Sequence, residues 1–251
     1  MIRINTAFLK QASPPASANT YEEHYLAEKA STRRLTWLDL VIAGGILSDL
    51  VLSLVDATMK WWYIGLVEVF LSLYLLSWLL ARGIRPLLGR LLLAGFIAGV
   101  CELFTDASGQ YVVHSLIYPT GALTLWTSPL YMPLSWMVVL THLGYLAWRL
   151  RVVMGWRKAS LLSAILGAIQ IPIYEEMAYY GGWWRYKPVH LMLGHTPIYV
   201  LLFEGLIVAA LPLLYDRIER RAWRQVALIG VIVGVWMAVA ALVAWLVLGL
   251  W

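Results

Sequence analysis

Long apolar stretches alternate with short polar connections along nearly the whole chain. A stretch of about 20 apolar residues is typical of a transmembrane helix, so the pattern predicts an all-α, polytopic membrane protein. Seven transmembrane helices are expected, at about 38–57, 62–80, 87–106, 128–148, 161–181, 197–215 and 226–248. The polar residues 1–35 are expected to form an N-terminal arm, and residues 36–251 the seven-helix transmembrane domain.

Composition narrows the class of protein further. Hydrophobic residues make up 61% of the chain and charged residues 13%, which leaves no room for a separate soluble domain. The net charge of +5 then reflects the loops between helices rather than nucleic-acid binding. Cys101 is the only cysteine, which excludes an intrachain disulfide, and the polar start of the chain is no cleavable signal peptide.

The basic residues indicate an orientation. If the seven spans alternate in direction, 16 of the 19 basic residues fall on one side of the membrane, and only Lys60, Arg185 and Lys187 fall on the other. Because cytoplasmic loops carry an excess of Lys and Arg, the N-terminal arm is expected in the cytoplasm and the C-terminus outside.

Eight acidic residues fall within or at the ends of the expected spans, all in the outer half of the bilayer. Ionisable groups at this depth are costly and usually face a partner or a cavity. Their common level therefore predicts one polar cavity that opens toward the outer face. The eight are Asp49, Asp56, Glu68, Glu102, Asp106, Glu175, Glu176 and Glu204.

An internal duplication accompanies this pattern. The segment at about 87–150 resembles the segment at about 158–217, with Glu102 matched to Glu175 or Glu176 and the turn at 128–131 matched to that at 196–199. Both copies run in the same direction, so the third and fourth spans and the fifth and sixth spans form a parallel duplication of a helical hairpin. The first two spans are interpreted as a worn third copy, in which Glu68 corresponds to Glu204 and to Trp136 of the middle copy.

The acids suggest proton-transfer chemistry. Glu102 and Asp106 are four residues apart and share a helix face, and two such carboxyls in an apolar site cannot both ionise cheaply. One of them is therefore a candidate proton donor, the alternative being an acid that only hydrogen-bonds across helices. Glu175 and Glu176 point about 100° apart on a helix, so one is expected to face the cavity and the other to pair with Arg185. Glu204 and Glu68 are expected to be supporting acids.

Aromatic residues near these acids are candidates for contact with a substrate. Aromatic faces stabilise cations, and an acid beside such faces suits protonation of a carbon–carbon double bond followed by capture of the carbocation. The alternative is an interfacial aromatic belt without a catalytic role. The candidates are Trp183, Trp184, Tyr179, Trp136, Tyr111 and Tyr186.

A metal site is an alternative to this chemistry. His114, His190 and His195 lie in outer loops near the acids, and histidines with carboxylates can hold iron, copper or zinc. No HExxH or HxxxH array is present, and no metal or other cofactor is expected. His142 is expected to be a packing or hydrogen-bonding residue.

The repeated pattern resembles small integral membrane enzymes of isoprenoid metabolism. Glu102, Gly109, Tyr111, Pro129, Pro133 and Trp136 resemble the carotenoid-biosynthesis proteins that include the bisanhydrobacterioruberin hydratases. Pro172, Glu175 and Glu176 resemble the heterodimeric-type lycopene cyclases, and the run from Gly167 through residues 194–199 to Pro212 is similar to the EXPERA group of sterol isomerases. The resemblance covers about 120 residues and implies acid-initiated chemistry on a polyene or sterol double bond.

The sequence therefore predicts a membrane enzyme that uses intramembrane carboxylates to protonate a double bond of an isoprenoid lipid, as a cyclase, isomerase or hydratase. Its expected partners are the hydrophobic substrate and the lipid bilayer, with a homo- or hetero-oligomer left open. Two other interpretations stay open. One is an accessory subunit of a larger membrane complex, and the other is a proton- or cation-coupled carrier.

Overall fold

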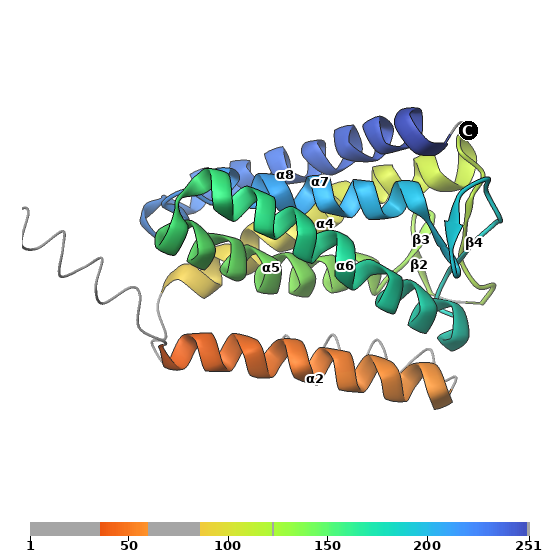
Figure 1. The fold of residues 1–251 in the computed structure, drawn as a ribbon, viewed down its shortest axis with the longest axis horizontal. Helices are drawn as coiled ribbons and strands as arrows, with labels where there is room; N and C mark the ends of the chain where they lie inside the picture. Colours follow the sequence, from red (N-terminus) through yellow and green to blue (C-terminus); the bar gives the residue numbers. More distant parts are fainter. Residues whose placement is uncertain (1–35, 60–85, 122, 250–251) are drawn as a thin grey trace, which may run out of the picture. The chain divides into compact units, whose positions relative to one another are not determined.

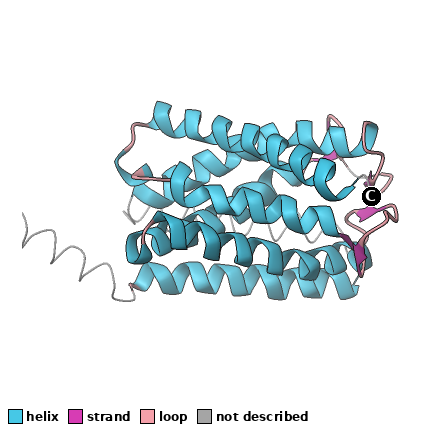
Figure 2. Ribbon diagram, turned by 45° about the horizontal axis from the view of Figure 1, so that its top comes forward, coloured by secondary structure: helices cyan, strands magenta, loops and turns pink. Residues whose placement is uncertain are grey.

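The computed structural model describes residues 36–59, 86–121 and 123–249. Long helices run side by side in this part of the chain, and the short strands gather at one end (Figures 1 and 2). The helices are α2 (Trp37–Met59), α4 (Pro86–Tyr111), α5 (Met132–Met154), α6 (Trp156–Gly181), α7 (Ile198–Leu214) and α8 (Trp223–Ala244). A 3-10 turn, η1 (Ile218–Arg220), precedes α8, and a π-helical turn, η2 (Trp245–Gly249), follows it.

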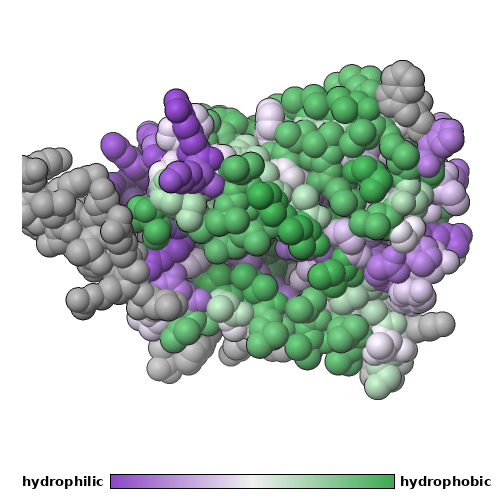
Figure 3. Space-filling view, viewed as in Figure 1, coloured by the Kyte–Doolittle hydropathy of each residue, from purple (hydrophilic) through white to green (hydrophobic). Residues whose placement is uncertain are grey.

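The all-α, polytopic membrane fold is confirmed. Five helices are long and apolar enough to cross a membrane, at Trp37–Met59, Leu87–Tyr111, Met132–Met154, Trp156–Gly181 and Trp223–Gly249, and α7 is a shorter apolar helix of 17 residues. Apolar residues cover the middle of the face seen in Figure 3, with hydrophilic residues at its two ends. The expected span at 62–80 and the arm at 1–35 lie outside the described residues, so the count of seven stays a prediction.

Three pairs of two-residue strands, which the sequence reading did not predict, close the loops at one end of the helices. Strands β2 (Thr124–Leu125) and β3 (Ser128–Pro129) form one tight hairpin, and β5 (Met192–Leu193) and β6 (Thr196–Pro197) form another. Strands β1 (Leu116–Ile117) and β4 (Arg185–Tyr186) pair antiparallel with each other. The β1–β4 pair joins the loop after α4 to the loop after α6.

The two helical hairpins repeat with a constant separation of 68 residues. This separation relates β2 to β5 and β3 to β6. It also makes Ile117 equivalent to Arg185, and these two residues face each other in the β1–β4 pair. It also relates Gly99 to Gly167. A side chain at Gly99 would lie 2.5 Å from the carbonyl oxygen of Pro133, and one at Gly167 would lie 2.7 Å from Val208, so both glycines allow their hairpin's helices to approach closely.

This register corrects one detail of the duplication. It confirms the equivalence of Trp136 and Glu204, but it pairs Glu102 with Gln170, about one and a half helical turns before Glu175 and Glu176. Sequence similarity alone paired Glu102 with the doubled glutamate because it aligned acid with acid. In the proposed third copy, the second span with Glu68 lies outside the described residues.

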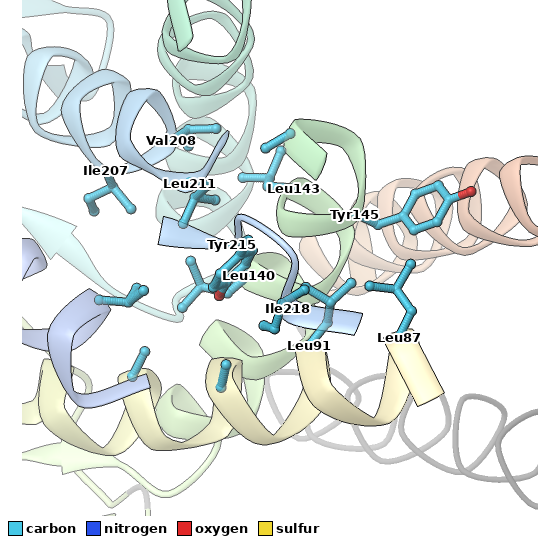
Figure 4. Close-up of a cluster of buried hydrophobic side chains, with 14 of the residues drawn as sticks. Leu87, Leu91, Leu140, Leu143, Tyr145, Ile207, Val208, Leu211, Tyr215 and Ile218 are labelled. Carbon is cyan, nitrogen blue, oxygen red and sulfur yellow. The ribbon is translucent and has the colours of Figure 1, made fainter. Parts of the chain in front are cut away.

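The main apolar core fills the end of the helices away from the strands. It joins the first half of α4 to the second halves of α5 and α7 (Figure 4). Tyr215 and Ile218, just beyond α7, are fully buried within it. Ion pairs surround this end: Arg149 contacts Asp39 at 3.0 Å, and Arg151 pairs with Asp216. The core thus leaves the half of the bundle nearer the strands for a cavity.

Candidate functional site

A cavity of about 460 Å³ lies among the helices, between the apolar core and the strands. Its lining is mostly apolar, with residues from all six described helices. Five acids and one histidine also line it, which fits the expectation of a common polar cavity. They are Asp49, Glu102, Asp106, Glu175, Glu204 and His142.

Glu102 and Asp106 form one cluster in this cavity. Their side chains are neighbours, as expected for residues one turn apart on α4, and both are more than nine-tenths buried. Two carboxyl groups placed together in an apolar cavity cannot both ionise cheaply, so one of them is a candidate to carry a proton. The side chain of Trp136 lies beside Glu102 and lines the same cavity.

Tyr118, in the loop after β1, completes this cluster. Its hydroxyl donates a hydrogen bond of 2.5 Å to Oδ2 of Asp106. Burial, and after it the charges of Asp106 and Glu102, raise the pKa of the Tyr118 hydroxyl well above its ordinary value. Tyr118 therefore stays protonated and acts as a fixed donor to the acid pair.

Glu175 forms a second cluster, on α6. The indole Nε1 of Trp184 donates to its Oε2 at 2.7 Å, and the hydroxyl of Tyr186 lies 3.4 Å from its Oε1. The chain reverses for this contact at Gly182, whose left-handed backbone (φ 73°) ends α6 and favours glycine. Trp184 can thereby reach the carboxyl nine residues earlier in the chain.

Glu204 lies on α7, close to both clusters. It is almost fully buried, and its Oε2 has no hydrogen-bond partner among the described residues. It interacts electrostatically with Glu175 and with Glu102. A buried polar atom without a partner, beside a cavity, is placed to meet a ligand or a water molecule.

Glu176 faces away from this cavity, and the expected pairing with Arg185 is wrong. Its Oε1 accepts the backbone N–H of His195 at 2.8 Å, and its Oε2 lies 2.8 Å from Nδ1 of the same histidine. Tyr179 stacks on the His195 ring with 3.5 Å between centroids. The contact holds the β5–β6 hairpin against the end of α6. Of the doubled glutamate, only Glu175 faces the cavity, as expected for one of the two.

The candidate aromatic residues divide in the same way. Trp136, Trp184 and Tyr186 line the cavity. Tyr111, Tyr179 and Trp183 do not: the first two are exposed, and Trp183 packs against Ala57 and α6. Three of the six expected aromatic residues thus lie away from the cavity, because neighbours in sequence near a helix end point in different directions. Glu68 lies outside the described residues.

The sequence pattern placed Asp49 at this cavity but did not select several other residues that line it. Asp49 of α2 pairs with Nδ1 of His142 of α5 at 3.0 Å, and both side chains are buried. Tyr118, Tyr199 and Trp245 also line the cavity. One signal was available for Tyr118, which lies 68 residues before Tyr186 in the duplicated unit.

The three loop histidines do not meet around a common point. His195 is engaged by Glu176, and Nδ1 of His114 lies 3.1 Å from the carbonyl oxygen of Gln110. In the part of the chain that the structure describes, no three His, Cys, Asp or Glu side chains are arranged to hold a metal ion.

Comparisons with known proteins identify a family without an activity. Residues 100–248, more than half of the chain, match the model of a family described as Domain of unknown function (DUF6989). No curated protein and no solved structure matches the chain. The matched region contains both acid clusters but not α2.

Proposed function

We propose that this chain, which belongs to the family described as Domain of unknown function (DUF6989), is a membrane enzyme that protonates a carbon–carbon double bond of an isoprenoid lipid. The observation that carries the proposal is the placement of two neighbouring, buried carboxyl groups, Glu102 and Asp106, in the cavity. Two carboxyl groups in an apolar site cannot both ionise cheaply, so this pair is suited to hold a proton beside space for a ligand. Positioned general acids of this kind contribute roughly 10²–10⁴-fold to a rate.

The walls of the cavity suit such a substrate. Its mostly apolar lining favours a hydrocarbon chain, and a volume of about 460 Å³ is within the usual range of ligand sites. Trp136 contacts the acid pair and lines the same space. An aromatic face stabilises positive charge, so a carbocation formed next to the acid pair would be stabilised there. The resemblance to isoprenoid enzymes supports the same substrate class.

The charges at the two ends support an orientation. Nine basic residues of the described helices and loops belong to the end away from the strands, and only Arg185 and Lys187 belong to the strand end. By the positive-inside rule we place the strand end, with the cavity near it, outside the cytoplasm. Because α2 begins at the basic end, where Asp39 meets Arg149, the N-terminal arm is placed in the cytoplasm. The π-helical turn η2 follows α8 at the strand end, where Trp245 contacts Tyr199, so the C-terminus is placed outside.

The proposal is tested with purified protein in lipid nanodiscs and three probes: geranylgeraniol, squalene and lycopene. Incubation in D₂O followed by mass spectrometry reports deuterium bound to carbon. We expect wild-type protein to introduce deuterium into at least one probe. In the double variant Glu102→Gln/Asp106→Asn the rate of deuterium incorporation is expected to be lower by a factor of about 100 or more. Glu219→Gln is the matched control, since Glu219 accepts from Trp148 outside the cavity. The proposal would be overturned if none of the probes gained deuterium. It would also be overturned if the double variant introduced deuterium at the wild-type rate.

A further inference from the structure

Two carboxyl oxygens that line the cavity have no hydrogen-bond partner among the described residues. They are Oε2 of Glu102, which belongs to the acid pair, and Oε2 of Glu204 on α7. The positions one turn before and after Glu204 are Val200 and Val208, so this carboxyl group has no second acid on its own helix face. Glu204 is only 5% exposed, and a buried polar atom that stays unpaired is costly. Its free oxygen is therefore placed to receive a polar group of the ligand.

The duplication indicates which side chain shares this place with Glu204. In the first hairpin, a side chain at Gly99 would lie 3.0 Å from Cβ of Trp136. In the second, a side chain at the equivalent Gly167 would lie 3.0 Å from the carbonyl oxygen of Glu204. The helices of the two hairpins therefore approach each other at equivalent positions. Gln170 lies three residues after Gly167, on the same face of α6, and it lines the cavity as Glu204 does.

The combination of Gln170 and Glu204 is suited to hold a hydroxyl group. A side-chain amide donates through its NH₂ group and a carboxyl oxygen accepts, whereas a hydroxyl group both donates and accepts hydrogen bonds. One hydroxyl group can therefore accept from Gln170 and donate to Oε2 of Glu204 at the same time. The equivalent positions of the first hairpin hold Glu102 and Trp136, so the duplicated cavity differs between its two halves at these positions.

The charge of the cavity lining narrows the ligand further. In the described part of the chain no Lys or Arg side chain lines the cavity, whereas five carboxyl groups do. Phosphate and diphosphate groups are usually recognised by Arg and Lys, and ionised carboxylates repel them. A neutral head group therefore suits this cavity better than a phosphate.

From these observations we propose that the substrate is an isoprenoid alcohol, whose hydroxyl group binds between Gln170 and Glu204. The inference rests on the proposed function and names the substrate class of the same cavity. The hydrocarbon chain lies along the apolar lining, where one of its double bonds meets the acid pair of Glu102 and Asp106. Because the hydroxyl group fixes one end of the chain, Gln170 and Glu204 determine which double bond reaches the acids. A pure hydrocarbon lacks the group that these two side chains bind.

The test measures equilibrium binding, which does not depend on turnover. Three ligands with the same chain are compared: geranylgeraniol, the hydrocarbon in which hydrogen replaces its hydroxyl group, and geranylgeranyl diphosphate. Each is titrated onto full-length protein in lipid nanodiscs, and empty nanodiscs correct for partition into the lipid. The wild type and the Glu102→Gln/Asp106→Asn variant are both measured, so that conversion of the ligand cannot affect the result.

We expect wild-type protein to bind the alcohol about 10-fold or more tightly than the hydrocarbon, which leaves buried polar groups unpaired. The diphosphate is expected to bind more weakly than the alcohol. The variant Gln170→Leu/Glu204→Leu is expected to bind alcohol and hydrocarbon equally, and its binding of the hydrocarbon shows that the cavity is intact. Each single substitution is expected to reduce the preference for the alcohol. Glu219→Leu is the matched control and is expected to keep the preference, since Glu219 accepts from Trp148 outside the cavity.

The outcomes separate the inference from the proposed function. The inference would be overturned if wild-type protein bound neither ligand, bound alcohol and hydrocarbon equally, or bound the diphosphate more tightly than the alcohol. A preference for the alcohol that survived in Gln170→Leu/Glu204→Leu would also overturn it. Deuterium incorporation into squalene or lycopene that depends on Glu102 and Asp106 would still support double-bond protonation in these cases. Conversely, an alcohol bound through Gln170 and Glu204 without deuterium in any probe would keep the hydroxyl site and overturn the proposed function.

Discussion

Tyr131 and Tyr199 occupy equivalent positions in the two hairpins, and each hydroxyl crosses to the other hairpin at an equivalent place. Tyr131 donates to the carbonyl oxygen of Trp183 at 3.1 Å, and the Tyr199 hydroxyl lies 2.8 Å from Oγ of Ser115. Ser115 and Trp183 are themselves 68 residues apart. The two contacts are thus related by an approximate twofold axis, which passes near the facing residues Ile117 and Arg185.

These reciprocal contacts are expected to stabilise the strand end of the fold. Tyr131→Phe and Tyr199→Phe each remove one hydroxyl without changing the ring, so each is expected to lower the free energy of unfolding by about 1 kcal/mol. Thermal unfolding in detergent measures the loss. Tyr180→Phe is the control, because its ring is exposed. If neither Tyr131→Phe nor Tyr199→Phe lowered the melting temperature, these hydrogen bonds would add no stability.

Two neighbouring glycines of α2 give a sharper test of how this helix docks. A side chain at Gly45 would lie 2.8 Å from Nε2 of His142, whereas nothing lies within 4 Å of the corresponding position at Gly44. Gly45→Ala is therefore expected to displace His142 from Asp49 and to cost about 1–3 kcal/mol, as overpacking usually does. Gly44→Ala is expected to be neutral or slightly stabilising, because alanine favours the helix.

Thermal unfolding of the two variants in detergent compares them directly. Equal melting temperatures for Gly44→Ala and Gly45→Ala would contradict the close contact between α2 and His142. The same measurement on His142→Ala in the Gly45→Ala background is expected to recover part of the loss, because the smaller side chain removes the clash.

Alkaline pH is expected to destabilise the fold through Tyr118 and Tyr186. Burial, and then nearby carboxyl groups, raise the pKa of each hydroxyl well above its ordinary value in the folded protein, whereas an unfolded tyrosine ionises near pH 10. The raised pKa means that the folded state keeps protons that the unfolded state releases. The stabilisation is therefore complete below about pH 10 and is lost as the pH rises toward the folded pKa.

Melting temperatures measured on either side of pH 10 test this linkage. The wild-type melting temperature is expected to fall more steeply with pH than that of the double variant Tyr118→Phe/Tyr186→Phe. Tyr180→Phe, at an exposed position, is expected to keep the wild-type slope. An equal slope in the double variant would show that other groups govern the alkaline loss of stability.

The helices and the level of the acids were predictable because each depends on position along the chain. Apolar length defined α2, α4, α5, α6, α7 and α8, with boundaries that differ by a few residues, and the common level of the acids along the helices predicted a cavity lined by five of them. Direction around a helix was harder to predict. Tyr179 and Glu176 turn to His195 while Glu175 turns inward, and the apolar sequence gives no clear period to orient α6.

Contacts between segments distant in sequence were not predictable either. The pairing of Asp49 with His142 joins helices whose facing surfaces are set by packing. The two-residue strands are too short to leave an alternating pattern, and their pairing depends on the meeting of two loops. The duplication could have supplied one of these residues. Its 68-residue register relates Tyr118 to the candidate Tyr186, so it would have added Tyr118 of the first hairpin to the aromatic candidates.

The proposed orientation predicts which loops a reagent reaches from outside the cell. His190 is exposed in the loop between β4 and β5, and Arg157 is exposed at the opposite end, at the start of α6. In a Cys101→Ser background, His190→Cys is expected to react with a membrane-impermeant maleimide on intact cells. Arg157→Cys is expected to react only after the membrane is permeabilised, because the excess of basic residues keeps its end in the cytoplasm. The reverse labelling pattern would place the cavity near the cytoplasmic face, where a substrate would have to enter from the inner leaflet.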